Sequence, residues 1–125
     1  MKENDISYEI RGLSYKVYNK LGPGLLESIY EQALAYELTK EGFDVKTQSC
    51  LPVKYDDIFM DKGFRLDLLV EEKVIVEIKL VEELSFLHKK QLLTYLKISG
   101  LILGILINFN TININNSIIR IANRL

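Results

Sequence analysis

The chain of 125 residues contains no tryptophan, only two prolines and a single cysteine, Cys50. A lone cysteine cannot form an internal disulfide, and it cannot supply a cysteine-rich zinc module. Few cysteines are typical of proteins in a reducing compartment, and the first residues lack the apolar stretch of a signal peptide. We therefore expect a cytoplasmic protein.

Long apolar runs and a large excess of one charge are also missing. The longest apolar run, residues 101–107, is interrupted by Gly104, and a membrane-spanning helix needs roughly 20 apolar residues. Sixteen basic and seventeen acidic side chains give a net charge of −1, which excludes a strongly basic coat for nucleic acid. We expect no membrane partner, and any basic surface has to be local.

The residues that are present indicate one globular α/β domain over residues 1–125, because 48% are hydrophobic and 26% are charged. Apolar residues at steps of three and four predict helices, and alternating or continuous apolar runs predict strands. The predicted helices cover residues 5–21, 24–40 and 85–99, and the predicted strands cover residues 43–55, 64–70, 74–80 and 101–109. Pro52 marks an edge or a bulge. This order of elements predicts a mixed central sheet flanked by helices.

The strands expected on either side of residues 71–73 form a β-hairpin whose register decides where its charged residues point. A three-residue loop places Asp67 opposite Glu77 and Arg65 opposite Lys79, all on one face. A two-residue loop shifts the register by one and separates the two carboxylates. We favour the three-residue loop because it brings two carboxylates and two cations together.

Paired carboxylates are ligands that a hard divalent cation such as Mg²⁺ or Mn²⁺ prefers. Such a cation can activate water and stabilise charge on a phosphoryl oxygen, and a neighbouring Lys79 could orient the water. Cross-strand salt bridges, Asp67 with Lys79 or Arg65 with Glu77, would explain the same residues without any chemistry. Spacing alone favours the salt bridges.

Two of the predicted helices carry polar residues on one side. Gly24, Glu27 and Tyr30 follow one another at steps of three, and Glu27 interrupts an apolar stretch. A glutamate at a helix N-terminus can simply interact with the helix dipole. Gln91 and Tyr95 share a face of the later helix, where a partly buried polar stripe is the structural alternative.

These residues together resemble the GxxExxY family. Residues 24–30 contain the name-giving motif complete, and similar stretches follow in the family's order at residues 65–70, 77–79, 91–96 and 104–109. The resemblance covers residues 10–121. It places the chain in the PD-(D/E)xK nuclease-like superfamily and implies a restriction-endonuclease-like core, with a mixed sheet between helices.

The resemblance also implies a role for seven residues of one site. The metal ligands that it implies are the side chains of Asp67 and Glu77 and the backbone carbonyl of Ile78. The catalytic and supporting residues that it implies are Lys79, Glu27, Gln91 and Tyr95.

The leading interpretation is a Mg²⁺- or Mn²⁺-dependent nuclease that hydrolyses phosphodiester bonds in DNA or RNA. Phosphate binding needs basic side chains, and a symmetric homodimer could bring two sets of them together. The candidates are Arg65, Lys89, Lys90 and Lys97. The alternative is a nuclease-like module that binds nucleic acid or assembles proteins without turnover. The intact set of Asp67, Glu77 and Lys79 favours the enzyme, whereas the net charge of −1 is unusual for it.

Overall fold

The structure is a computed structural model that describes residues 1–123, with every side chain except that of Lys62. Its elements follow the order α1 (Glu3–Leu21), α2 (Glu27–Lys40), β1 (Val45–Tyr55), β2 (Ile58–Val70), β3 (Val74–Lys79), α3 (Phe86–Ser99), β4 (Leu103–Asn108), a 3-10 turn (Ile114–Asn116) and β5 (Ile118–Ala122). None of the described helices combines the length and the apolar composition needed to cross a bilayer.

The five strands form one mixed sheet in the order β1-β2-β3-β4-β5. Neighbouring strands are antiparallel except β3 and β4, which are parallel and are connected through α3. A parallel pair needs such a crossover because its strands enter the sheet from the same end. The predicted mixed sheet between helices is therefore confirmed, and β5 is a strand beyond those predicted.

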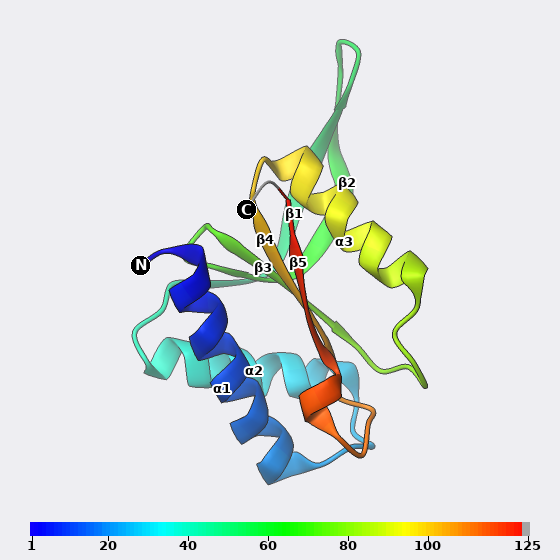
Figure 1. Ribbon diagram of the computed structural model, residues 1–125. Helices are drawn as coiled ribbons and strands as arrows, with labels where there is room; N and C mark the ends of the chain where they lie inside the picture. The colour runs from blue at the N-terminus through cyan, green and yellow to red at the C-terminus, as the bar shows by residue number, and fades with distance from the viewer. Residues whose placement is uncertain (124–125) are drawn as a thin grey trace.

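The helices cover the two faces of the sheet unequally (Figure 1). α1 and α2 pack on one face, and α3 packs on the other. The first core includes Ile6, Ile10, Leu34, Leu38, Val76, Ile78 and Ile107. The second, smaller core contains Leu66, Leu69, Ile75, Leu92, Leu96 and Leu106. Because both faces are covered, β3 and β4 are almost entirely buried, as continuous apolar runs predict.

The termini of α3 follow from local chemistry. Ser85 is the N-cap, and its Oγ accepts a hydrogen bond of 3.2 Å from the His88 amide. The His88 ring returns the bond, because Nδ1 accepts from the Ser85 amide at 3.0 Å. Gly100 ends the helix with a φ of +79°, a conformation that glycine adopts without strain. The single histidine of the chain is thus a helix cap.

Two predicted elements differ from the structure by three residues or more at their first residue. α2 begins at Glu27 rather than at Gly24, because Gly22 and Gly24 have φ values of +67° and +103° that no helix contains. β2 begins at Ile58 rather than at residue 64, because it pairs with β1 well beyond the body of the sheet (Figure 1). The pairing of β1 with β2 is irregular between Leu51 and Val53, so Pro52 marks a bulge as predicted.

Candidate functional site

The β2–β3 hairpin has the predicted register over its first three pairs, from Val70–Val74 to Leu68–Val76. Beyond this point the regular pairing stops, and two carboxylates bind the neighbouring backbone amides instead. The Asp67 amide donates to Glu77 Oε2 at 2.7 Å, and the Ile78 amide donates to Asp67 Oδ2 at 2.8 Å. Each carboxylate is thereby fixed against the opposite strand.

Both carboxylates are held in an environment that disfavours their charge. Glu77 is only 5% exposed, and burial followed by the charge of Asp67 raises its pKa to about 8. Burial also raises the pKa of Asp67, although the hydrogen bond from the Ile78 amide counteracts the effect. Two adjacent carboxylates with raised pKa values are a common feature of sites that bind cations or catalyse proton transfer.

Lys79 is half-buried at the end of β3, next to these carboxylates. Its positive charge lowers the pKa values of Asp67, Glu77 and Glu27 against the effect of burial. Among residues 1–123, no ion pair joins Asp67 or Glu77 to Lys79 or Arg65. The cross-strand salt bridges therefore do not form. The charge of Lys79 instead acts on three carboxylates at once.

Asn108 fixes the chain that follows Lys79, a role that the sequence analysis missed. Asn108 lies opposite Lys79 in the parallel β3–β4 pair. Its side chain accepts from the Val81 amide at 3.2 Å and donates to the Val81 carbonyl at 2.9 Å. A lone asparagine that ends a buried apolar strand was the available signal, because a buried amide needs partners.

Glu27 reaches this site from the first turn of α2. Burial and then the charge of Asp67 raise its pKa, so Glu27 lies within electrostatic range of Asp67. The loop before Glu27 is fixed by Tyr30, whose hydroxyl donates to the Gly22 carbonyl at 2.6 Å and accepts from the Leu25 amide at 3.1 Å. The fully buried Tyr30 ring stacks on Phe109 at a centroid distance of 4.6 Å. Tyr30, the last residue of the motif, thus closes the loop that contains Gly24 and precedes Glu27.

Tyr95 and Gln91 approach the carboxylates from α3. Burial and the charges of Glu77 and Asp67 raise the pKa of Tyr95, and a hydrogen bond with Gln91 lowers it. The Tyr95 ring also stacks on Phe64 at 4.0 Å, which connects α3 to β2. The two polar residues therefore lie at the edge of the same site.

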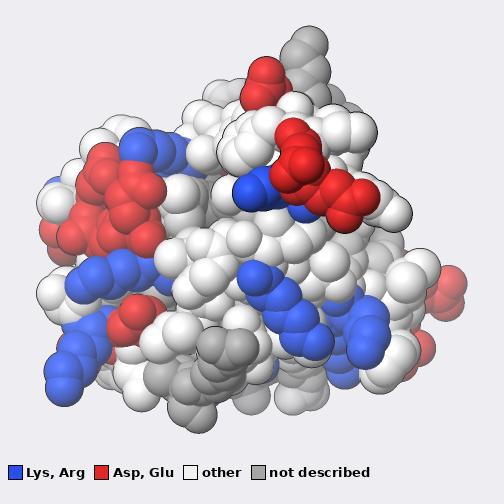
Figure 2. Space-filling model, turned by 90° about the horizontal axis from the view of Figure 1, so that it is seen from above, with Lys and Arg blue, Asp and Glu red and all other residues white. Residues whose placement is uncertain are grey.

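The four candidate phosphate-binding residues are not brought together. Arg65 lies next to the site, with its Nη1 atom 3.5 Å from Gln48 Oε1. The other three, Lys89, Lys90 and Lys97, are exposed on α3. At about 100° per residue, they point roughly 100° or more away from the direction of Gln91. Figure 2 shows Lys and Arg in separate groups, with acidic groups between them.

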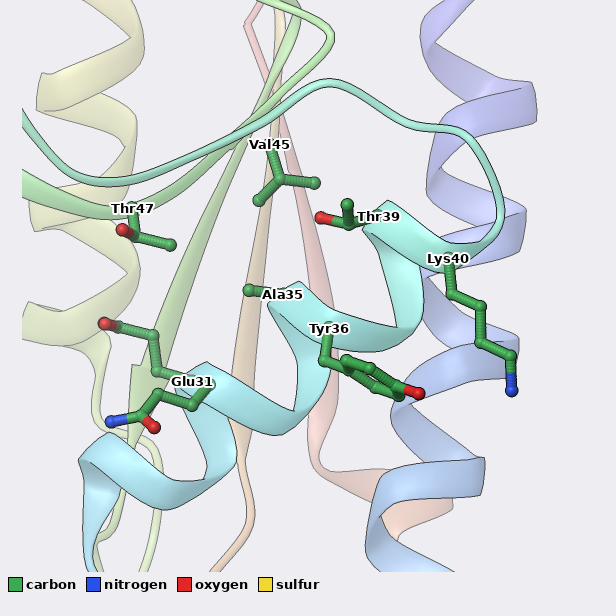
Figure 3. A pocket seen from close by; sticks show the side chains of 8 residues that line it. Glu31, Ala35, Tyr36, Thr39, Lys40, Val45 and Thr47 are labelled. Carbon is green, nitrogen blue, oxygen red and sulfur yellow. The ribbon is translucent and has the colours of Figure 1, made fainter.

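Two further polar residues of the site were not predicted. Glu31 lies one helical turn after Glu27, and burial and the charge of Asp67 raise its pKa. Its Oε1 atom accepts a hydrogen bond of 2.5 Å from Gln48 Nε2 on β1. Figure 3 shows Glu31 extending from α2 toward Thr47, at one end of a groove of about 670 Å³ between α2 and the edge strand β1. The four-residue step from Glu27 could have identified Glu31.

The oxygen donors fit a hard divalent cation. The second oxygen of Glu77 takes no hydrogen bond from the described residues, and a cation there would offset the burial and the charge of Asp67, which raise the pKa of this group. Within residues 1–123, no three His, Cys, Asp or Glu side chains are arranged to hold a metal. The site therefore offers two carboxylates, and a backbone oxygen such as the carbonyl of Ile78 would complete it.

Comparisons with known proteins identify a similar fold and a family. The crystal structure of SSO0001 has a similar fold, with a TM-score of 0.58 and 24% sequence identity. The match covers 79% of this chain and 51% of that chain, so this chain spans about half the length of SSO0001. Among curated proteins no match is found. A family model described as the PD-(D/E)XK nuclease superfamily matches residues 4–121. The chain therefore belongs to the PD-(D/E)XK nuclease superfamily.

Proposed function

We propose that this protein is a divalent-metal-dependent nuclease that hydrolyses phosphodiester bonds in nucleic acid. The observation that carries the proposal is the pair of carboxylates formed by the half-buried Asp67 and the buried Glu77, each bound to the opposite strand's amide and flanked by Lys79. Membership of the superfamily supports a nuclease-like role. The metal dependence rests on the donor set described above.

In this mechanism Asp67, Glu77 and the Ile78 carbonyl would hold Mg²⁺ or Mn²⁺. The cation, when bound, supplies positive charge that stabilises the phosphoryl oxygens and lowers the pKa of water. Lys79 orients the attacking water and stabilises the negative charge that develops on the phosphoryl group. The water oxygen forms a bond to phosphorus, the bond to the leaving oxygen breaks, and that oxygen takes up a proton.

The remaining polar residues support the reaction from two helices. Glu27 provides a third carboxylate on the α2 side, and the Gln91–Tyr95 pair lies on the α3 side. The turn of Gly22 and Gly24, closed by the Tyr30 hydroxyl, supports assignment to the GxxExxY branch. Arg65 is the basic residue next to the site that is best placed for a substrate phosphate.

Cleavage assays test this proposal directly. The wild type is incubated with single- and double-stranded DNA and RNA, with Mg²⁺, with Mn²⁺ and with EDTA. We expect metal-dependent cleavage that Asp67→Asn removes, whereas Asp57→Asn, in the exposed β1–β2 turn, leaves it intact. If the wild type binds nucleic acid under all these conditions but never cuts it, the nuclease proposal is wrong and the non-catalytic binding module replaces it.

A further inference from the structure

In β1 and β2, the side chains switch from one face of the sheet to the other at one pair of residues, Gln48 and Asp67. The pairing runs from Thr47–Leu68 to Ser49–Leu66 and omits the pair between them. Leu68 packs in the core under α1 and α2, whereas Leu66 packs in the core under α3. Residues two apart in a regular strand share a face. The strands therefore reverse sides at Gln48 and Asp67.

The backbone of Gln48 is the local cause of this reversal. Its φ is +51°, in the left-handed region that a side chain with a Cβ atom disfavours. The other described non-glycine residues with positive φ are Asp56, Glu71 and Glu72, and all three lie in hairpin turns. Gln48 is thus the one described residue with this strain inside a strand. Such strain persists only where the surroundings enforce it, often at functional sites.

The side chain of Gln48 connects the site residues that surround it. Its Nε2 atom donates to Glu31 Oε1 at 2.5 Å, and its Oε1 atom lies 3.5 Å from Arg65 Nη1. The same amide also lowers the pKa of Asp67, so it lies near that carboxylate. One primary amide has two donor hydrogens and one acceptor oxygen, and the bond to Glu31 leaves the second hydrogen for Asp67.

We propose that Gln48 is the positioning residue of the cation site, an inference that rests on the proposed function. Its left-handed backbone interrupts the β1–β2 pairing and turns Asp67 toward Glu77. Its amide then holds the carboxylates of Asp67 and Glu31 in place before any cation arrives. A neutral amide suits this position, because a cationic side chain would compete with the metal and an acidic one would add repulsion.

Substitution by glycine separates the two contributions of Gln48. In Gln48→Gly the glycine adopts the left-handed backbone conformation without strain, but the side-chain amide is lost. The matched control is Asp56→Gly, which relieves a φ of +52° in the distant β1–β2 turn. Mn²⁺ affinity is measured by isothermal titration calorimetry, thermal unfolding is measured without metal, and cleavage is measured separately.

Both glycine variants should melt at the wild-type temperature or above it. Gln48→Gly alone should bind Mn²⁺ about 10- to 100-fold more weakly, the usual effect of removing an outer-sphere partner of a metal site. Unchanged Mn²⁺ affinity in Gln48→Gly would overturn the proposal. If Gln48→Gly fails to fold, Gln48→Asn replaces it. Asparagine tolerates the left-handed region, but its amide is one carbon too short to reach Glu31.

The measurements distinguish this inference from the nuclease proposal. If the wild type binds Mn²⁺ without cutting any substrate, the nuclease proposal fails, while the Mn²⁺ affinity of Gln48→Gly still decides the role of Gln48. If the wild type binds no Mn²⁺, both proposals are overturned. If Gln48→Gly loses Mn²⁺ affinity only because it unfolds, the Gln48→Asn variant decides. A folded Gln48→Asn that also loses the affinity supports the inference. A folded Gln48→Asn that keeps the affinity shows that the role of Gln48 is structural and that the inference is wrong.

Discussion

Two buried glutamates in this molecule have pKa values that are shifted in opposite directions. Glu37, between α1 and α2, is 6% exposed, and Glu77, on β3, is 5% exposed. A hydrogen bond from Lys16, with its Nζ atom 3.1 Å from Glu37 Oε2, keeps the pKa of Glu37 below its usual value. Burial raises the pKa of Glu77 to about 8. Burial alone therefore does not decide the charge of a glutamate; its partner does.

The two sites differ in whether the carboxylate has a lysine partner of its own. At Glu37 one lysine faces one carboxylate, so the pair is neutral within the chain itself. At Glu77 the charge of a single lysine, Lys79, is shared with Asp67 and Glu27. If all three carboxylates were ionised, their charge would exceed that of the one lysine, and burial together with the charge of Asp67 instead raises the pKa of Glu77 to about 8. A buried carboxylate without a partner of its own is expected where a residue serves function rather than stability.

Removing each lysine gives the largest expected contrast between the two sites. Lys79→Ala should lower the cleavage rate by about 100-fold or more while the protein folds and binds Mn²⁺, because an electrostatic stabiliser of the reaction is lost. Lys16→Ala should leave cleavage unchanged and lower the melting temperature, because Glu37 then loses its partner. If Lys79→Ala lowers only the melting temperature, Lys79 is a structural residue.

The stability of the metal-free protein should fall as the pH rises. The unfolded chain releases the Glu77 proton near the ordinary pKa of 4.5, whereas the folded protein retains it up to about 8. Deprotonation therefore favours the unfolded state between these values, and the free energy of unfolding should drop by roughly 1 to 3 kcal/mol between pH 5 and pH 8. Urea unfolding in EDTA measures the slope. Glu77→Gln should flatten it, and a slope that is unchanged in this variant would assign it to other groups.

Tyr30→Phe should have a smaller effect on stability. The change removes the hydroxyl that bonds the Gly22 carbonyl and the Leu25 amide but keeps the ring stacked on Phe109. We expect a loss of about 1 kcal/mol in the free energy of unfolding and a lower cleavage rate, because the loop before Glu27 loosens. The control is Tyr8→Phe, on the exposed surface of α1. Equal behaviour of the two variants would show that the hydroxyl does not fix the loop.

The smallest expected effect concerns Glu37 and has the opposite pH dependence to that of Glu77. A carboxylate whose pKa is lowered in the folded state stabilises the fold above the ordinary value of 4.5, and this contribution disappears as the pH falls through its folded pKa. Glu37→Gln should therefore melt slightly below the wild type at pH 7, and the gap should close in acid. A gap that widens in acid would contradict the pairing with Lys16.

Much of the fold could be predicted because the residues buried by a helix or a strand recur in the sequence at the spacing of that element. The apolar steps of three and four in α1 and the continuous apolar runs of β3 and β4 indicate their structure directly. The hairpin register followed from the length of one loop, and the structure has this register in the three pairs next to the loop. Short-range patterns such as these need no knowledge of distant partners.

Other parts of the site could not be predicted, because they depend on contacts between distant segments. Gln48 interrupts the alternation of β1 with a left-handed backbone at a residue other than glycine, and no local pattern marks it. The first residues of β2, from Ile58 on, are mostly exposed. They therefore lack the apolar pattern by which a strand is predicted. The resemblance implied which residues carry the chemistry, but not that Lys79 influences three carboxylates at once.

A calorimetric Mn²⁺ titration of three proteins tests the central claim most directly, namely that Asp67 and Glu77, which form no ion pair with a described residue, hold a divalent cation. The proteins are the wild type, Glu77→Gln and Glu37→Gln, in which the same substitution is made at two equally buried positions. We expect saturable binding to the wild type and to Glu37→Gln, and binding at least about 100-fold weaker to Glu77→Gln, since a direct ligand contributes more than an outer-sphere partner. Equal Mn²⁺ affinity of the two variants, or no binding by the folded wild type, would contradict the claim.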